Sequence, residues 1–507
     1  MFTDKRMILY RGSLKSCNYQ CSYCPFSKHK GSDQERDRDR EQWLRFVEHV
    51  SKKNMGLALE PGAIMVAPYG EALIHPWYWE GLGRLTSFPH IELAGAQTNL
   101  SFSIEESLKR YQRAGGRKGK LRLWATFHPE MTGEQEFADK CRRLLEEGVF
   151  LCAGAVGVPD NLERLQRLRD LLPEEIYLWV NKMDGWKRPY TEEEIKAFLA
   201  VDPYFYRELA IAKADPGQCG NRLFAEADGR QRVCNIGPVM NESWYDSCQG
   251  ELRKQPECKR RQCSCYLAYG GRRDVMNQIL FGPYPLFRIP RRPKAVFLDI
   301  QGTLIPKDKG AVPERVRQDL EALKGQGSRL FFATTLPLKD AARRCREIWP
   351  LFEGGIFSGG AHLVWKEDGK TKELVRPIKK RGLELLKKAA GSFHARLLSY
   401  EAKGALYKIT LVRSVRAPWT EEEKEDIAGV CRSLWGEEVR LLIEGRCLEI
   451  TAAEAKKEEG VRFLCSRLNL APQETAAAGD SPEDEAMIRV TLSISSHTVP
   501  AAFPHIF

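Results

Sequence analysis

Short apolar runs alternate with amphipathic stretches over residues 1–205, and this alternation limits the fold more than any other feature. Six runs have the length of a strand: residues 7–10, 63–67, 91–97, 121–127, 149–158 and 176–182. The stretches between them, such as residues 136–148 and 161–172, are helix-like. Strands that alternate with helices form a parallel sheet covered by helices. We therefore predict an α/β fold, with a partial (βα)6 barrel whose chemistry lies at the C-terminal strand ends.

The 507-residue chain is too long for one hydrophobic core. Residues 206–282 are rich in cysteine and weakly periodic, and a second α/β pattern opens at residue 295. The four prolines of GPYPLFRIPRRPK between them disfavour regular structure. We expect four parts in consequence: 1–205, 206–282, a linker at 283–294, and 295–507.

The net charge of +11 allows an anionic partner such as nucleic acid, a nucleotide or a phosphorylated substrate. The alternative is a solubility charge spread over a large surface, since no long Lys/Arg block stands out. No apolar run reaches the length of about 18 residues typical of a membrane-spanning helix. The N-terminal residues 1–12 carry charges where a signal peptide has an apolar stretch. We expect a cytoplasmic protein with no membrane partner.

Three cysteines, Cys17, Cys21 and Cys24, form a CxxxCxxC loop directly after the first predicted strand. In a reducing compartment, clustered cysteines indicate metal or redox chemistry. Three thiolates can hold three irons of a [4Fe–4S] cluster and leave the fourth iron open, as a catalytic cluster requires. A zinc site with His29 as fourth ligand is the alternative.

This loop resembles that of the radical S-adenosylmethionine (SAM) superfamily, and the resemblance extends over about residues 5–200. Tyr23 supplies an aromatic neighbour to the third cysteine. In residues 68–76, Gly70 and Glu71 match the family's GGE stretch that binds the SAM amino group, although Tyr69 and Ala72 depart from it. Residues 98–101, which contain Thr98 and Asn99, are similar to the family's TNG-type turn. Residues 155–159 are similar to the family's segment near the adenine.

The resemblance implies that the open iron binds SAM and that one electron cleaves it to methionine and a 5′-deoxyadenosyl radical. This radical abstracts hydrogen from a substrate, and a flavodoxin or ferredoxin would supply the electron. His128 and Glu130 follow the fourth predicted strand, where barrels collect polar groups. His128 would contact SAM or substrate, or be a loop histidine without a role. Asn181 and Lys182 at the end of the sixth strand allow the same interpretation.

A second group of cysteines begins with Cys219 and Cys234, which flank a predicted β-hairpin with Asp228–Gly229 as its turn. The group resembles the SPASM/twitch extension of radical SAM enzymes, which implies one auxiliary [4Fe–4S] cluster. Complete thiolate ligation would suit such a cluster to electron transfer or structure, and a zinc knuckle is the alternative. The remaining ligands would be two of Cys258, Cys263 and Cys265.

The C-terminal pattern resembles the haloacid dehalogenase (HAD) superfamily over residues 294–490. The resemblance implies a Rossmann-like domain with an α/β cap at about residues 375–445. It also implies four motifs. The first supplies the nucleophile Asp299, and the second supplies the phosphate-binding hydroxyl of Thr334. The third supplies a lysine, Lys457 with Lys456 as the alternative, and the fourth supplies the Mg²⁺ ligands Asp480 and Asp484.

Gln301 stands where the family has its general acid/base aspartate. Glutamine cannot exchange a proton, and losing an acid/base costs roughly 10²–10⁴-fold in rate. The domain would be a slow phosphotransferase, a binder of phosphorylated substrate or a structural relic. Together the motifs predict a radical SAM enzyme acting on a phosphorylated small molecule or nucleotide. A radical SAM peptide maturase and an RNA-binding or RNA-repair protein are the alternatives.

Overall fold

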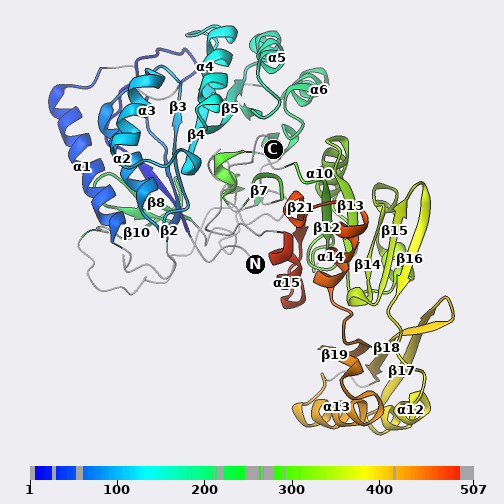
Figure 1. Cartoon of the computed structure of the whole chain (residues 1–507). Coiled ribbons are helices and arrows are strands. Elements are labelled where there is room, and N and C mark those ends of the chain that lie inside the picture. Colours follow the sequence, from blue (N-terminus) through cyan, green and yellow to red (C-terminus); the bar gives the residue numbers. More distant parts are fainter. Residues whose placement is uncertain are drawn as a thin grey trace. The chain divides into compact units, whose positions relative to one another are not determined.

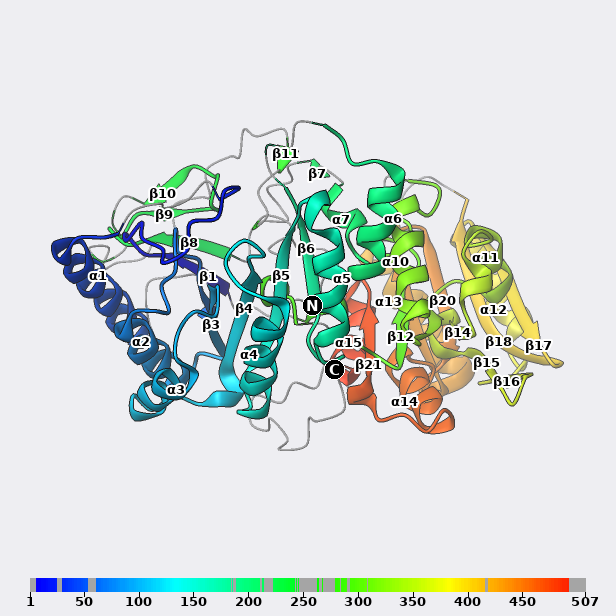
Figure 2. The ribbon, with the colours of Figure 1, turned by 90° about the horizontal axis from the view of Figure 1, so that it is seen from above.

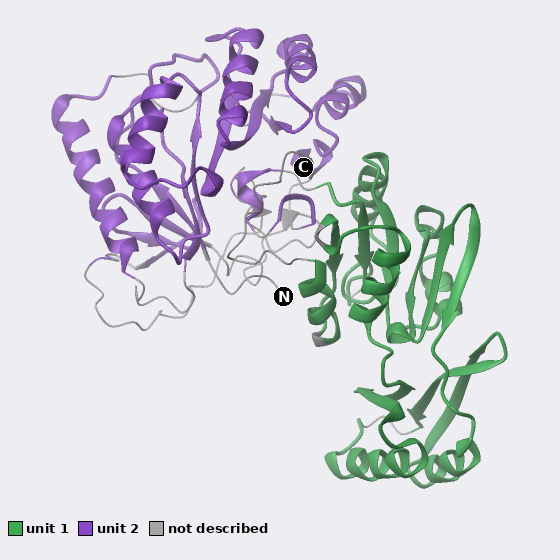
Figure 3. Cartoon of the chain, viewed as in Figure 1, with its two compact units in different colours: residues 1, 292–495, 506 green, residues 2–291, 496–505, 507 purple. Residues whose placement is uncertain are grey.

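The computed structural model describes residues 6–24, 30–52, 61–183, 185, 188–209, 212–213, 222–241, 243, 245, 262–263, 267, 279–282, 284–289, 292–307, 309–414 and 418–491. They form two compact units, made up mainly of residues 2–291 and residues 292–495 (Figure 3). The boundary lies close to the predicted start of the second α/β pattern.

Six strands of the first unit pair in parallel in chain order, which confirms the predicted α/β fold. They are β1 (Arg6–Arg11), β2 (Pro61–Val66), β3 (Leu93–Thr98), β4 (Leu121–Phe127), β5 (Phe150–Gly157) and β6 (Leu178–Lys182). On the other side of β1 the parallel strand β8 (Arg222–Glu226) begins an antiparallel continuation through β9 (Gln231–Arg232) and β10 (Val239–Asn241). The predicted hairpin at Asp228–Gly229 is therefore confirmed, and Gly229 has a φ of +96°.

Helices cover the outer face of this sheet (Figure 2). They are α1 (Asp33–Ser51), α2 (Pro76–Ser87), α3 (Ile104–Arg113), α4 (Glu134–Glu146), α5 (Leu162–Leu171) and α6 (Glu192–Val201). Ser32 and Glu35 form a capping box that explains why α1 begins where it does. Because successive strand residues point to opposite faces, Ile8 and Tyr10 join this outer core, while Met7 and Leu9 face inward. Three further elements of this unit are short: α7 (Tyr206–Leu209), β7 (Ala212–Lys213) and β11 (Gln262–Cys263).

The proline-rich segment differs from the expected linker. Residues 284–289 pack against the inner face of the sheet, with Leu286 and Phe287 buried beside Met7 and Met65. The Arg288 guanidinium lies 4.2 Å from the Trp124 ring centre and 3.9 Å from that of Trp179. Pro285 suits such a segment because it needs no strand hydrogen bonds, while Leu286 and Phe287 supply apolar side chains to the inner core.

The second unit contains a six-stranded sheet and a separate four-stranded sheet (Figure 1). The first consists of β12 (Ala295–Leu298), β13 (Arg329–Ala333), β14 (Gly354–Phe357), β15 (His362–Glu367), β16 (Lys370–Val375) and β21 (Thr475–Ala478). Its helices are α10 (Glu314–Gly325), α11 (Leu338–Arg344), α14 (Lys457–Arg467) and α15 (Pro482–Thr491).

The four-stranded sheet lies in the predicted cap region. It contains β17 (Ala395–Ala402), β18 (Ala405–Arg413), β19 (Val439–Glu444) and β20 (Cys447–Ala452), with α12 (Leu383–Ser392) and α13 (Glu421–Trp435). Because β20 pairs with both β18 and β19, the insert extends to Ala452, beyond the expected end near residue 445. In the part of the chain that the structure describes, no helix is long and apolar enough to cross a membrane.

The packing of residues 284–289 generates a stability prediction. Arg288→Ala removes a cation that pairs with buried Glu208 at 3.5 Å, and so leaves a carboxylate buried without that partner. Breaking one side of a buried ion pair costs about 3–5 kcal/mol. We expect the urea midpoint of the first unit, followed by tryptophan fluorescence, to fall clearly. Exposed Arg113→Ala is the control, and equal midpoints for both variants would restore the linker interpretation.

Candidate functional site

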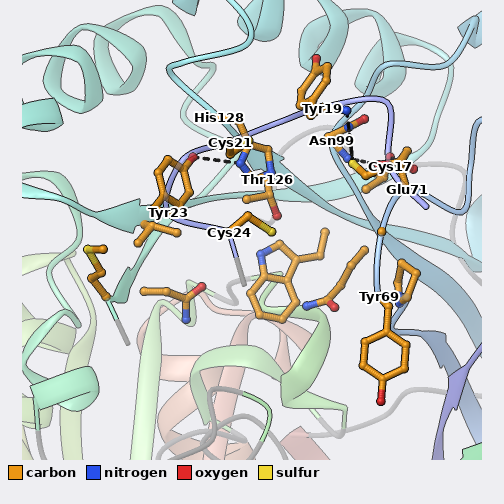
Figure 4. Close-up of a pocket in the computed structure, with 18 of the residues that line it drawn as sticks. Cys17, Tyr19, Cys21, Tyr23, Cys24, Tyr69, Glu71, Asn99, Thr126 and His128 are labelled. Atoms are coloured by element: carbon orange, nitrogen blue, oxygen red, sulfur yellow. Dashed lines mark hydrogen bonds between the residues drawn. The ribbon is translucent and has the colours of Figure 1, made fainter. Parts of the chain in front are cut away.

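A pocket of about 490 Å³ lies at the C-terminal ends of the parallel strands (Figure 4). The loop after β1 brings Cys17, Cys21 and Cys24 to its wall. Other walls come from the ends of β2, β3, β4 and β6, which is the convergence that parallel pairing in chain order requires. The sequence-predicted residues that line it are Tyr23, Gly70, Glu71, Thr98, Asn99, His128, Asn181 and Lys182.

We call residues 12–24 the cysteine loop. Cys21 is buried, whereas Cys17 and Cys24 are half-buried. The Tyr19 amide donates to Cys17 Sγ at 3.4 Å, and the Cys24 amide donates to the Cys21 carbonyl at 3.2 Å. Burial and the neighbouring thiols raise the pKa of Cys21 to about 11. The thiols of Cys17 and Cys21 are therefore close enough for Cys17 to raise the pKa of Cys21, and metal binding would release their protons.

The three thiols of the cysteine loop suit an iron–sulfur cluster, and His29, the fourth ligand of the alternative zinc site, lies outside the described residues. Among the described residues, one set of three thiol, carboxylate or imidazole side chains has ligand atoms that all lie within 4.8 Å of one another. This set consists of aspartates of the second unit. Thiolates around one zinc ion lie only about 3.8 Å apart, given a Zn–S bond of about 2.3 Å. The three sulfurs of the cysteine loop do not all lie within 4.8 Å of one another, and soft thiol donors at such a spacing suit a multi-iron cluster.

Glu71 connects the loop after β2 to the end of β3. Its buried carboxylate accepts hydrogen bonds from the Thr98 hydroxyl at 2.9 Å, the Leu73 amide at 2.9 Å and the Asn99 amide. Its own amide donates to the Ser16 carbonyl at 3.0 Å, next to Cys17. Burial raises its pKa to about 7, although these donors oppose the shift. The predicted residues of the second and third strand ends thus form one hydrogen-bonded unit with the cysteine loop.

The end of β4 contacts the same loop from the other side. The Tyr23 hydroxyl lies 2.9 Å from His128 Nδ1, and Glu130 accepts a hydrogen bond from the Ser22 amide at 2.6 Å. Burial lowers the pKa of His128 to about 4, so its imidazole is neutral at physiological pH. Of the two interpretations left open for His128, the structure therefore favours a place in the site.

Sequence reasoning missed several lining residues. Trp124 and Thr126 on β4 and Gln97 on β3 also line the pocket. The period of two along β4 could have identified the first two, because Leu123, Ala125 and Phe127 belong to the outer core. Tyr69 is a lining residue whose ring lies 4.3 Å from the Arg11 guanidinium, where the resembled family has glycine.

The predicted auxiliary site is described only in part. Cys234 is half-buried after β9, and Cys263 is buried on β11. The other predicted ligands lie outside the described residues: Cys219, Cys258 and Cys265.

A second candidate site lies at the end of β12. Asp299 follows this strand, and the buried Lys457 amine donates to Asp299 at 2.8 Å and to Asp484 at 2.6 Å. Ligand atoms of Asp299, Asp480 and Asp484 lie within 4.8 Å of one another. Gly302, with a φ of +80°, permits this approach, because an added Cβ would lie 2.2 Å from Asp480 Oδ2. Hard carboxylate oxygens are the ligands that Mg²⁺ prefers, so this donor set fits the ion.

Electrostatics hold this second site together. Burial and Asp484 raise the pKa of Asp299 to about 6, while Lys457 opposes the rise. The two carboxylates raise the pKa of Lys457 despite its burial, so it stays charged. Thr334 is buried immediately after β13, the strand that pairs with β12, and its hydroxyl accepts from the Leu336 amide at 3.2 Å. Gln301 is exposed, and Lys307 contacts Asp480 at 2.8 Å.

The family described as haloacid dehalogenase-like hydrolase matches residues 420–495, so the C-terminal unit contains a HAD-like domain. No curated protein matches the chain. A haloacid dehalogenase-like hydrolase from Bacteroides thetaiotaomicron is 18% identical, with 39% of this chain and 85% of that chain covered and a TM-score of 0.33. One from B. subtilis is 18% identical, with 39% and 86% covered and a TM-score of 0.32. A HAD subclass IIB sugar phosphatase is 17% identical, with 39% and 84% covered and a TM-score of 0.32.

The aspartate trio generates a metal-binding prediction. Mg²⁺ should raise the unfolding temperature of the second unit, because an ion that binds only the folded state stabilises it. Asp484→Asn removes one ligand charge and one partner of Lys457, so we expect this shift to disappear. Glu485→Gln on the same helix is the control. An undiminished shift in Asp484→Asn, measured by differential scanning fluorimetry, would place the ion elsewhere.

Proposed function

We propose that residues 2–291 form a radical SAM enzyme that abstracts hydrogen from a small-molecule substrate. One observation carries the proposal: a single pocket at the ends of parallel strands contains all three cysteines together with Gly70, Glu71, Thr98, Asn99 and His128. These residues come from four different strand ends and from segments far apart in the chain. Their convergence supports the motif assignment better than the cysteine spacing alone.

Cys17, Cys21 and Cys24 would hold three irons of a [4Fe–4S] cluster, and SAM would bind beside them. A reduced cluster with an open iron supplies the electron that cleaves SAM and so produces a radical. The chain's own residues supply the walls. Glu71, Thr98 and Asn99 fix the strand ends next to Cys17, and Asn99 Nδ2 lies 3.9 Å from its sulfur. Tyr19, Tyr23 and Trp124 line the pocket with aromatic surface, which would limit the access of water to the reacting atoms.

An auxiliary [4Fe–4S] cluster remains part of the proposal, with Cys219, Cys234 and two of Cys258, Cys263 and Cys265 as ligands. Its support is the confirmed hairpin, whose strands lie between Cys219 and Cys234. An external electron donor of the flavodoxin or ferredoxin class would reduce the chain.

For the second unit we propose binding, and slow hydrolysis, of a phosphate group on a small molecule. Asp299 would attack phosphorus and Thr334 would hold a phosphate oxygen, while Lys457 keeps Asp299 ionised and in place. Mg²⁺ held by Asp299, Asp480 and Asp484 would neutralise phosphate charge. Since Gln301 cannot donate a proton, the leaving oxygen departs without general-acid help. Hydrolysis should therefore be slow for substrates with poor leaving groups.

The thiol ligands generate a prediction of iron content and SAM cleavage. After anaerobic reconstitution, two [4Fe–4S] clusters correspond to about eight irons per chain and one cluster to about four. Cys21→Ala should lose about four irons, and it should form no 5′-deoxyadenosine from SAM with dithionite as reductant. Half-buried Cys447→Ser in the second unit is the control. If 5′-deoxyadenosine still formed in Cys21→Ala, the radical SAM proposal would fail.

The replacement of the family's acid/base aspartate by Gln301 generates a prediction of phosphatase rate. Gln301→Asp restores a proton donor two residues after Asp299, so turnover of an alkyl phosphate with Mg²⁺ should rise at least about 10²-fold. Gln318→Asp on α10 is the matched control, and Asp299→Asn should remove the gain. Phosphate release measures all three. Equal rates for Gln301→Asp and the control would favour a phosphate-binding role without hydrolysis.

A further inference from the structure

A buried carboxylate outside the pocket contacts the cysteine loop. Asp39 lies on α1, the helix that follows the loop, and its side chain is fully buried. Asp39 Oδ1 accepts hydrogen bonds from the Leu14 amide at 3.1 Å and the Ser13 hydroxyl at 3.5 Å. From α2 it receives the Tyr78 hydroxyl at 3.2 Å, and Oδ2 receives Trp77 Nε1 at 3.2 Å. Four donors from two separate segments thus converge on one side chain.

The loop passes so closely over this carboxylate that residue 12 has no room for a side chain. A Cβ on Gly12 would lie 2.2 Å from the Tyr78 hydroxyl oxygen and 2.7 Å from Asp39 Oδ1. Two residues after Leu14, Ser16 is held as well. Its hydroxyl accepts from the Gly31 amide at 3.2 Å, and its carbonyl accepts from the Glu71 amide at 3.0 Å. The chain entering Cys17 is therefore fixed on both sides by these hydrogen bonds.

Only a carboxylate satisfies this arrangement. All four partners are donors, and an aspartate offers two oxygens that only accept. An asparagine would keep one acceptor oxygen and turn an NH₂ group towards a donor, which leaves a buried polar group unsatisfied. Asp39 does not line the pocket, so it acts on the site through the residues it contacts in the cysteine loop and in α2.

We propose that Asp39 is a positioning residue that holds the cysteine loop in its cluster-binding shape before the metal arrives. The cluster-binding part of this proposal rests on the function proposed above. Three sulfurs bind one cluster only when the loop places them together, so a loop without support would lose more conformational entropy on binding. A loop held at residues 12–16 keeps Cys21 buried and delivers its three sulfurs already placed, which lowers the entropy cost of cluster binding.

Alkylation of the apo chain tests the loop directly. Iodoacetamide is added to metal-free protein, and modification of the Cys21 peptide is followed by mass spectrometry. Because Cys21 is only 4% exposed, it reacts when the loop opens. Asp39→Asn should react at least about tenfold faster than wild type, since it loses a buried hydrogen bond. Exposed Asp37→Asn on the same helix should match wild type.

Tyr78→Phe removes one donor and leaves the carboxylate intact, so a smaller acceleration is expected. It decides the question if Asp39→Asn fails to fold by circular dichroism. Unchanged alkylation in the folded variants overturns the proposal. The iron retained after reconstitution distinguishes the role of Asp39 from the radical SAM function. Asp39→Asn should retain less than half of the iron that the cysteine loop of the wild type binds. If wild type holds no iron although alkylation differs, the radical SAM function fails and the role of Asp39 in loop shape stands.

Discussion

Parallel pairing of β1 to β6 in chain order is the constraint on which the first site depends. Each strand runs in the same direction, so every connection returns by a helix and every C-terminal end lies at one edge of the sheet. Residues from the second, third and fourth strand ends, which are far apart in sequence, meet the cysteine loop there. Glu71 makes this edge rigid, because it accepts hydrogen bonds from the end of β3 while its amide binds the loop that follows β1.

A parallel sheet must be covered on both faces, and the two faces of this sheet are covered differently. Helices supply the outer core, whereas residues 284–289 supply part of the inner one. Arg288 carries a charge into this interior, where Trp124, Trp179 and Glu208 surround it. Glu208 also accepts hydrogen bonds from Asn181 and the Lys182 amide, both of which line the pocket. The inner core and the pocket floor are thus one structure.

The two candidate sites differ in the groups that surround their ionisable side chains. In the second unit, the Lys457 ammonium group pairs with the carboxylates of both Asp299 and Asp484. In the first unit, burial raises the pKa of the Cys17 and Cys21 thiols, and Asp39 and Glu130 accept hydrogen bonds from backbone amides of the cysteine loop. A thiol site arranged in this way is suited to a ligand that displaces protons. An aspartate site arranged around a lysine is suited to an anion and a divalent cation together.

The strands, the hairpin at Gly229 and the order of motifs in both halves followed from sequence alone, because apolar periodicity and turn residues are local signals. Cys17, Cys21 and Cys24 could be predicted as metal ligands for the same reason, because all three lie in one short stretch of the sequence. Three features needed the tertiary structure: the burial of residues 284–289, the inward-facing Trp124, and the four donors around Asp39. The prolines of residues 283–294 predicted a linker, because their local preferences contain no information about a distant apolar face that lacks a cover. Local sequence determined which chemistry the chain carries, whereas long-range packing decided which side chains hold that chemistry in place.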